Sequence, residues 1–198
     1  MKHLFLILLA TTLIFTAMYT QQEPLRAVTY VDPNKIVGLW HDYAAIPNQS
    51  SAQCRWATTH DFFWNKKNHE MQFRSTCYSV DGRKIIREGQ MASSNSQSLS
   101  HFQTSSTKVF GHYIYIASKK YDVIGLDTAY RWMVIGHSSL KLGWIYSRTR
   151  EIPRRDLMKI KTVLESAGYD SCDFFTFPKQ NLDMRQPLCQ ILDRPHLY

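Results

Sequence analysis

The feature that most constrains the fold is a succession of short alternating or apolar segments that starts near residue 38. No amphipathic pattern of helical length interrupts it before residue 127. Turn residues separate the segments, among them Asp81-Gly82, a pair typical of a tight hairpin. Consecutive strands with short connections form an antiparallel meander. We therefore expect eight strands, over residues 39–46, 54–64, 70–80, 84–93, 108–117, 120–126, 130–136 and 143–148.

One helix is expected after these strands. Pro153 suits a first helical position, and Gly168 is typical of a helix end. Between them, apolar residues recur at helical spacing: Leu157, Ile160, Leu164 and Ala167. The opposite face is charged, so the helix should lie on the outside of the sheet. A short added strand, 174–177, follows before Pro178.

These elements predict an all-β fold: an eight-stranded antiparallel up-and-down barrel with one C-terminal α-helix packed outside and a short added strand. Closure removes exposed strand edges, and eight strands leave room for side chains and one small ligand. The alternative is a two-sheet sandwich, but the helix after the eighth strand favours the barrel. With 198 residues we expect one domain, the barrel over 28–178, followed by an extended C-terminal tail over 179–198.

The N-terminal segment has the pattern of an export signal. Lys2 precedes an unbroken apolar run from Leu4 to Ala10. We expect residues 1–20 to be a signal peptide, with an uncleaved anchor as the alternative because no clean cleavage pattern is present. No cysteine lies there to carry a lipid, so an outer-membrane lipid anchor is not expected. The protein should be exported, to the periplasm in a Gram-negative bacterium and otherwise secreted.

The four cysteines are Cys54, Cys77, Cys172 and Cys189. An even number in an oxidising compartment indicates two disulfides, and the residues alone leave three connectivities open. A metal-binding or reactive set is disfavoured because no C-x-x-C spacing occurs and the eight histidines are dispersed. We expect neither a metal nor a cofactor.

The formal charge of +8 comes from Lys and Arg scattered among Asp and Glu. Without a long basic run, this pattern indicates a solvated surface and no nucleic-acid partner. A weak peripheral contact with an acidic membrane surface is the partner that the charge allows.

Three segments resemble the signature regions of the lipocalin family, in the family's order. Gly38-x-Trp40 is similar to the family's entry into the first strand. Asp127, followed by Tyr130, is similar to the turn between the sixth and seventh strands, and Arg148 to the Arg that ends the eighth. The resemblance covers residues 31–178 and comes nearest to bacterial outer-membrane lipocalins and apolipoprotein D-like members. The chain departs from them in its serine-rich loop over 95–107 and in lacking the lipoprotein cysteine.

The resemblance implies a floor for the barrel and a disulfide pattern. Trp40 and Arg148 should stack and plug one end, a contact that contributes about 0.5–2 kcal/mol; the plainer alternative is a core Trp and a surface Arg. Both roles are structural and not catalytic. Apolipoprotein D-like members bridge a cysteine at the start of the second strand to the tail. That implies Cys54–Cys189 and leaves Cys77–Cys172.

Strand alternation predicts which side chains face inward. If Arg131 faces out and Arg148 plugs the floor, the inward residues nearby are Tyr130, Trp132, Val134, Trp144 and Tyr146. The same reasoning adds Phe73, Tyr113 and Tyr115 as ligand-binding candidates.

An aromatic cavity binds by removing apolar ligand surface from water. We expect transport of a fatty acid, lysophospholipid or similar lipid by a monomer or homodimer, which the resemblance also implies. One alternative is a barrel filled by its own aromatics, acting through its surface. The other is an enzyme using Cys77, but four paired cysteines leave no thiol. Residues 135–139 lack the G-x-S-x-G pattern of a serine nucleophile. We therefore expect no enzyme.

Overall fold

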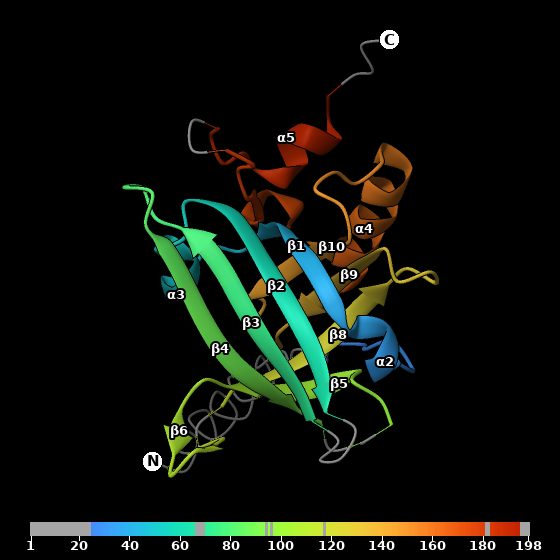
Figure 1. Cartoon of the computed structure of the whole chain (residues 1–198). Helices are drawn as coiled ribbons and strands as arrows, with labels where there is room; N and C mark the ends of the chain where they lie inside the picture. Colours follow the sequence, from blue (N-terminus) through green and yellow to red (C-terminus); the bar gives the residue numbers. More distant parts are fainter. Residues whose placement is uncertain are drawn as a thin grey trace, which may run out of the picture.

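The structure is a computed structural model that describes residues 25–65, 70–93, 95, 97–116, 118–180 and 183–194. Eight antiparallel strands close into a barrel (Figure 1), which confirms the predicted fold class. The expected signal peptide lies outside the described residues. The barrel strands are β1 (Gly38–Ala45), β2 (Trp56–Asn65), β3 (Glu70–Tyr78), β4 (Lys84–Ala92), β5 (His101–Ser105), β8 (Lys120–Leu126), β9 (Trp132–Gly136) and β10 (Gly143–Ser147).

Each barrel strand pairs with the next, and β10 returns to pair with β1, where Asp42 lies opposite Tyr146. The added strand β11 (Phe175–Thr176) pairs with the end of β1 on the outside. Two short helices, α2 (Pro33–Ile36) and α3 (Gln49–Ala52), flank β1. No helix in the described part of the chain has the length and apolar character needed to cross a bilayer.

The fifth barrel strand differs from the prediction. It is β5, inside the expected serine-rich loop, where Phe102 and Ser105 are buried. The segment expected as the fifth strand forms instead a small hairpin of β6 (Lys108–Val109) and β7 (His112–Tyr113), which pair only with each other. Phe110 and Gly111 both have positive φ, 48° and 82°, so the chain reverses there and cannot continue as one strand.

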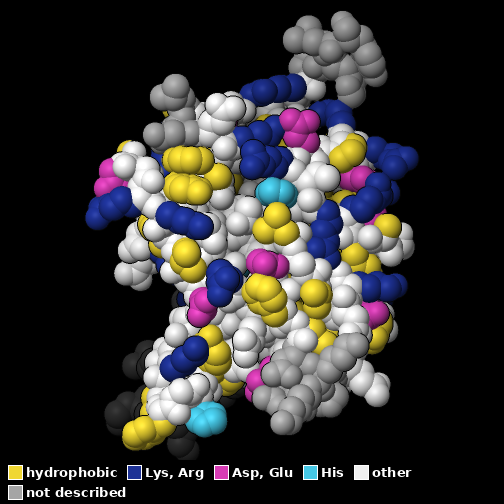
Figure 2. Space-filling model, viewed as in Figure 1, with side chains coloured by type: hydrophobic (Ala, Val, Ile, Leu, Met, Phe, Trp, Pro, Cys, Tyr) yellow, Lys and Arg dark blue, Asp and Glu magenta, His cyan; other side chains and the backbone are white. Residues whose placement is uncertain are grey.

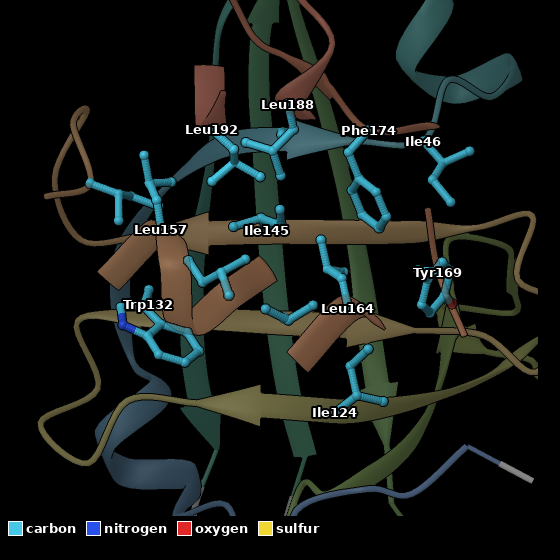
Figure 3. Close-up of a cluster of buried hydrophobic side chains, with 14 residues drawn as sticks. Ile46, Ile124, Trp132, Ile145, Leu157, Leu164, Tyr169, Phe174, Leu188 and Leu192 are labelled. Carbon is cyan, nitrogen blue, oxygen red and sulfur yellow. The ribbon is translucent and has the colours of Figure 1, made fainter. Parts of the chain in front are cut away.

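Helix α4 (Arg154–Ser166) lies against the outside of the barrel, as predicted. Pro153 is its N-cap, and Gly168 follows its end with a φ of 84°. Figure 3 shows the core between helix and barrel, where Leu157 and Leu164 pack near Ile145. Phe174 and Leu188 extend this outer core beyond the helix.

The predicted disulfide pairing is wrong. Cys54 pairs with Cys77, and Cys172 pairs with Cys189, so neither Cys54–Cys189 nor Cys77–Cys172 exists. The reason is local geometry: β2 and β3 form a hairpin in which Trp56 lies opposite Tyr78. Its register brings the Cα atoms of Cys54 and Cys77 to 5.4 Å.

The C-terminal tail is also not wholly extended. Cys172 lies in the 3-10 helix η1 (Ser171–Asp173) and Cys189 in α5 (Leu188–Leu192). The Leu188 N–H donates to the Phe174 carbonyl at 2.8 Å, which holds α5 beside η1 and next to its disulfide partner. The disulfide at Cys189 therefore joins the tail to η1 and not to the residue that precedes β2.

The turn between β8 and β9 is organised by Asp127, which is almost completely buried. Its carboxylate accepts hydrogen bonds from the backbone N–H groups of Ala129 and Arg131 and from the Arg131 guanidinium, at 2.8–3.2 Å. Arg131 also reaches the buried Asp156 in the first turn of α4, at 3.4 Å. Hydrogen bonding to Arg131 lowers the pKa of Asp127 to about 2. Asp127 thus orders the turn, and Arg131, which it holds, links the turn to the helix.

We predict that Asp127→Asn lowers the free energy of unfolding by about 1.5–3 kcal/mol at pH 7, because it removes charge-assisted hydrogen bonds. A carboxylate whose folded pKa is depressed stabilises the fold fully above its unfolded pKa of about 3.9. That contribution is lost as the pH falls towards 2. Urea denaturation at pH 7, 4 and 2.5 measures it. Glu88→Gln, which breaks the exposed Arg74–Glu88 pair, is the control and should cost under about 1 kcal/mol. Equal losses in both variants would refute this account of the turn.

Candidate ligand-binding cavity

One end of the barrel is closed by Trp40 and Arg148. The Trp40 side chain is fully buried, and its Nε1–H donates to the Ile36 carbonyl at 2.7 Å. The Arg148 guanidinium lies over this ring, with Cζ 3.9 Å from the ring centroid. It also donates to the carbonyl oxygens of Lys35, Ile36, Val37 and Leu39 at 2.6–3.3 Å. The pair expected from the sequence therefore lies in contact at the floor.

Gly38 is needed for this closure. Its φ of 96° is a conformation that glycine adopts without strain and that other residues rarely adopt. In addition, a Cβ at this position would lie 3.4 Å from an Arg148 nitrogen. Burial lowers the pKa of the Arg148 guanidinium from its ordinary value, but an arginine stays charged in a protein. The floor therefore contains a permanent, partly buried cation whose N–H groups are held by backbone oxygens and the face of an indole.

Above the floor lies a cavity of about 270 Å³. Its apolar wall consists of aromatic and aliphatic side chains from six strands: Phe62, Phe73, Phe102, Tyr121, Ile135, Trp144 and Tyr146. At its open end, Ser51 of α3, Cys54, Arg87 and Phe177 line the wall. Polar side chains, among them Ser75, Thr104 and Ser105, share the lining with the aromatic ones. A concave space that combines both kinds of side chain is typical of a small-molecule site.

Three predicted binding residues, Phe73, Trp144 and Tyr146, line this cavity. The Phe73 ring lies over Gly89, where a Cβ would come within 2.3 Å of its Cζ, so this glycine makes room for the ring. The Tyr146 hydroxyl is buried, and burial raises its pKa well above the ordinary value. It is therefore a neutral hydroxyl throughout the physiological range.

Two other predicted residues, Tyr113 and Tyr115, are not in the barrel interior. They line an outer groove of about 460 Å³ between the β6–β7 segment and strands β3 and β4. The predicted inward direction fails because the segment that carries them is not a barrel strand. Burial raises the pKa of Tyr115 to about 12.

The inward direction predicted for Trp132 and Val134 is wrong, whereas Tyr130 packs against the inner cluster of the barrel. Trp132 and Val134 pack in the outer core under α4 (Figure 3 labels Trp132), whereas Met133 and Ile135 face the interior. Tyr130 lies in the turn with a φ of 57°, and its hydroxyl accepts the Asp32 N–H at 2.9 Å. Its ring packs against the inner cluster near the floor but does not line the cavity.

The error has a definite cause. Arg131 is held at the turn by Asp127 and is not part of the strand alternation from which the prediction counted. Moreover, all five residues of β9 are buried, so the strand is apolar on both faces and its sequence carries no inward–outward signal.

Sequence reasoning missed a polar layer inside the cavity. His60 Nδ1 lies 2.7 Å from Asp42 Oδ1, and both side chains are largely removed from solvent, at 15% and 3% exposed. The His60 ring also contacts the edge of Tyr146, with centroids 5.2 Å apart. Alternation from Trp40 along β1 points to Asp42, so this residue could have been found once Trp40 was placed inside.

Both disulfides together use all four cysteines, so no thiol faces the cavity. Within the described ranges, no cluster of three His, Cys, Asp or Glu residues gathers that could hold a metal ion.

Comparison with known proteins agrees with this architecture. The family model for a lipocalin-like domain matches residues 31–179. A search of curated proteins gives no match. Insecticyanin from the tobacco hornworm Manduca sexta is similar in structure, with a TM-score of 0.60 and 16% identity over 77% of this chain and 83% of that one.

Two further solved structures are similar. The allergen Per a 4 from cockroaches has a TM-score of 0.59 and 17% identity, over 80% of this chain and 96% of that one. The siderocalin Ex-FABP has a TM-score of 0.53 and 14% identity, over 74% and 91%. At these identities the likeness shows a shared fold.

Proposed function

Because the chain belongs to the lipocalin-like domain family, we propose that it binds and carries a small hydrophobic or amphiphilic molecule of lipid type in its barrel. The lipocalin fold is known to bind small hydrophobic ligands. The observation that carries the proposal is the cavity of about 270 Å³ above the floor formed by Trp40 and Arg148. A barrel filled by its own side chains would leave no such space.

The size and lining of the cavity support a slender ligand. Burial of apolar ligand surface contributes roughly 25 cal/mol per Å², and aromatic walls supply that surface. A single-chain amphiphile such as a fatty acid or a lysophospholipid chain fits this description. The structurally similar siderocalin Ex-FABP functions through dual ligand specificities, which supports a ligand-binding role for such a barrel.

The same features support an extracellular carrier. Two disulfides and the lipocalin-like family suggest an extracellular protein. The family consists mainly of binding and transport proteins, which fits a protein that is not an enzyme. We also propose that the protein is a monomer or a homodimer and that an N-terminal signal directs its export.

A peripheral membrane contact is the second part of the proposal. Phe110 and Ile116 are 97% and 86% exposed on the segment that carries the β6–β7 hairpin, and Lys108 is exposed beside them. Figure 2 shows hydrophobic side chains at the lower left, where Figure 1 places β6. Elsewhere on this face, Lys and Arg are spread among Asp and Glu. An apolar tip beside a basic residue suits the interface of an anionic bilayer.

Bromine quenching tests the carrier function. Bromine at the end of a ten-carbon chain quenches tryptophan only at close range, so 10-bromodecanoic acid and 10-bromo-1-decanol should quench Trp144 in the cavity. We predict saturable quenching that persists in Trp132→Phe, because Trp132 lies in the outer core, and that falls sharply in Trp144→Phe. Absence of saturable quenching by both lipids, or its dependence on Trp132, would contradict binding in this cavity.

Vesicle flotation tests the membrane contact. Phe110→Ser should reduce binding to vesicles containing phosphatidylserine about fivefold or more, because it removes an exposed aromatic side chain from the bilayer interface. Val80→Ser is the control, since Val80 is an exposed apolar residue in a different turn. Equal binding by the wild-type protein and the Phe110→Ser variant would remove the hairpin from the proposal.

A further inference from the structure

The cavity holds a buried acid that is only partly satisfied. Asp42 is 3% exposed and uses Oδ1 to bond His60, at 2.7 Å. Among the described residues its second oxygen, Oδ2, takes part in no side-chain hydrogen bond, and the side chain lines the cavity. An ionised carboxylate is an acceptor only, with room for about four hydrogen bonds, and an incompletely paired buried carboxylate is costly. A ligand group that donates a hydrogen bond to Oδ2 would therefore complete the pairing of this carboxylate.

Two further groups of β2 extend the polar layer towards the open end. With Nδ1–H donating to Asp42, His60 Nε2 accepts in the neutral ring and donates in the imidazolium. Thr58 lies two residues away on the same face, and its Oγ1 is buried without a hydrogen-bond partner in the described part of the chain. Alternate residues of a strand are about 6.6 Å apart, so these groups form one polar strip.

The strip discriminates between head groups by charge. A carboxylate head cannot donate a hydrogen bond, and it would be placed in a low-dielectric space beside the Asp42 carboxylate. Within the part of the chain that the structure describes, the basic side chains of the lining are His60 and Arg87. Arg87 lies at the open end, where it bonds the Gln53 side-chain oxygen at 2.6 Å and approaches the Cys54 sulfur at 3.7 Å. A hydroxyl, in contrast, donates to Asp42 and can accept from or donate to His60 and Thr58.

We infer that the ligand enters with an uncharged hydroxyl at its inner end, which donates to Asp42 and is flanked by His60 and Thr58. This inference rests on the proposed carrier function and selects, among amphiphiles, neutral hydroxylated lipids over fatty-acid anions. The aromatic wall of Phe73, Trp144 and Tyr146 then covers the apolar part of the ligand. The polar strip selects the head group, and the aromatic wall supplies most of the affinity.

Three matched ligands test the inference on the wild-type protein: 1-decanol, decanoate, and 1-methoxynonane. The last is an isomer of decanol that has no O–H group. Affinities are measured by displacement of a fluorescent apolar probe at pH 7.5. We expect decanol to bind about 10- to 100-fold tighter than both competitors, the range that one hydrogen bond to a buried charged group gives.

A substitution localises the preference. Asp42→Asn keeps the shape of the side chain and removes its charge, so the ratio of decanol to decanoate affinity should fall about tenfold. Asp122→Asn is the matched control, because Asp122 forms the same kind of pair with His101, at 2.6 Å, on the outside of the barrel. Its ratio should match that of the wild type. Circular dichroism melting shows whether each variant is folded.

The outcomes separate the inference from the function it rests on. If none of the three ligands displaces the fluorescent probe and no brominated lipid quenches Trp144, the carrier function fails. If all three ligands bind equally, or decanoate binds tightest, the carrier function stands and the hydroxyl inference is overturned. An Asp42→Asn protein that does not fold leaves the wild-type comparison of decanol with its isomer to decide.

Discussion

The contact between Arg148 and Trp40 is the interaction on which the rest of the structure depends. Arg148 comes from the end of the last barrel strand and bonds carbonyl oxygens at positions 35, 36, 37 and 39, which lead into the first strand. It therefore fastens the two strands that must meet for the barrel to close. The Arg148 guanidinium is partly desolvated at this position. The backbone oxygens and the indole face take the place of the water molecules that would otherwise solvate it. Closure of the barrel and sealing of its floor are thus one event.

The barrel has two apolar cores separated by its own wall. One fills the lower interior around Trp40, Met71 and Met133, and the other lies between the wall and α4. This arrangement explains how far the sequence could predict the fold. The barrel, the outer helix and the floor pair follow from strand patterning, helix spacing and the resemblance to lipocalins. The direction of β9 could not be predicted, because both of its faces are buried and alternation is lost.

Other features depend on pairing between strands, which the local sequence does not encode. The serine-rich segment becomes β5 because Phe102 packs into the interior between neighbouring strands, while the more aromatic segment after it turns at Phe110 and Gly111. Likewise, the hairpin register of β2 and β3 sets the first disulfide, and no spacing rule supplies that register. The Asp42–His60 pair escaped prediction for the same reason: it joins two strands, and only the register shows that the two side chains meet.

Within this frame the cavity combines an aromatic wall with a small polar strip, so affinity and selectivity come from different residues. The floor is what makes such a site possible. A double-mutant cycle on Trp40→Leu and Arg148→Met, followed by urea denaturation, tests it most directly. The account predicts a coupling energy of about 0.5–2 kcal/mol between the two side chains, in addition to the cost of each single change. Additive losses, with no coupling, would contradict the claim that this contact closes the barrel.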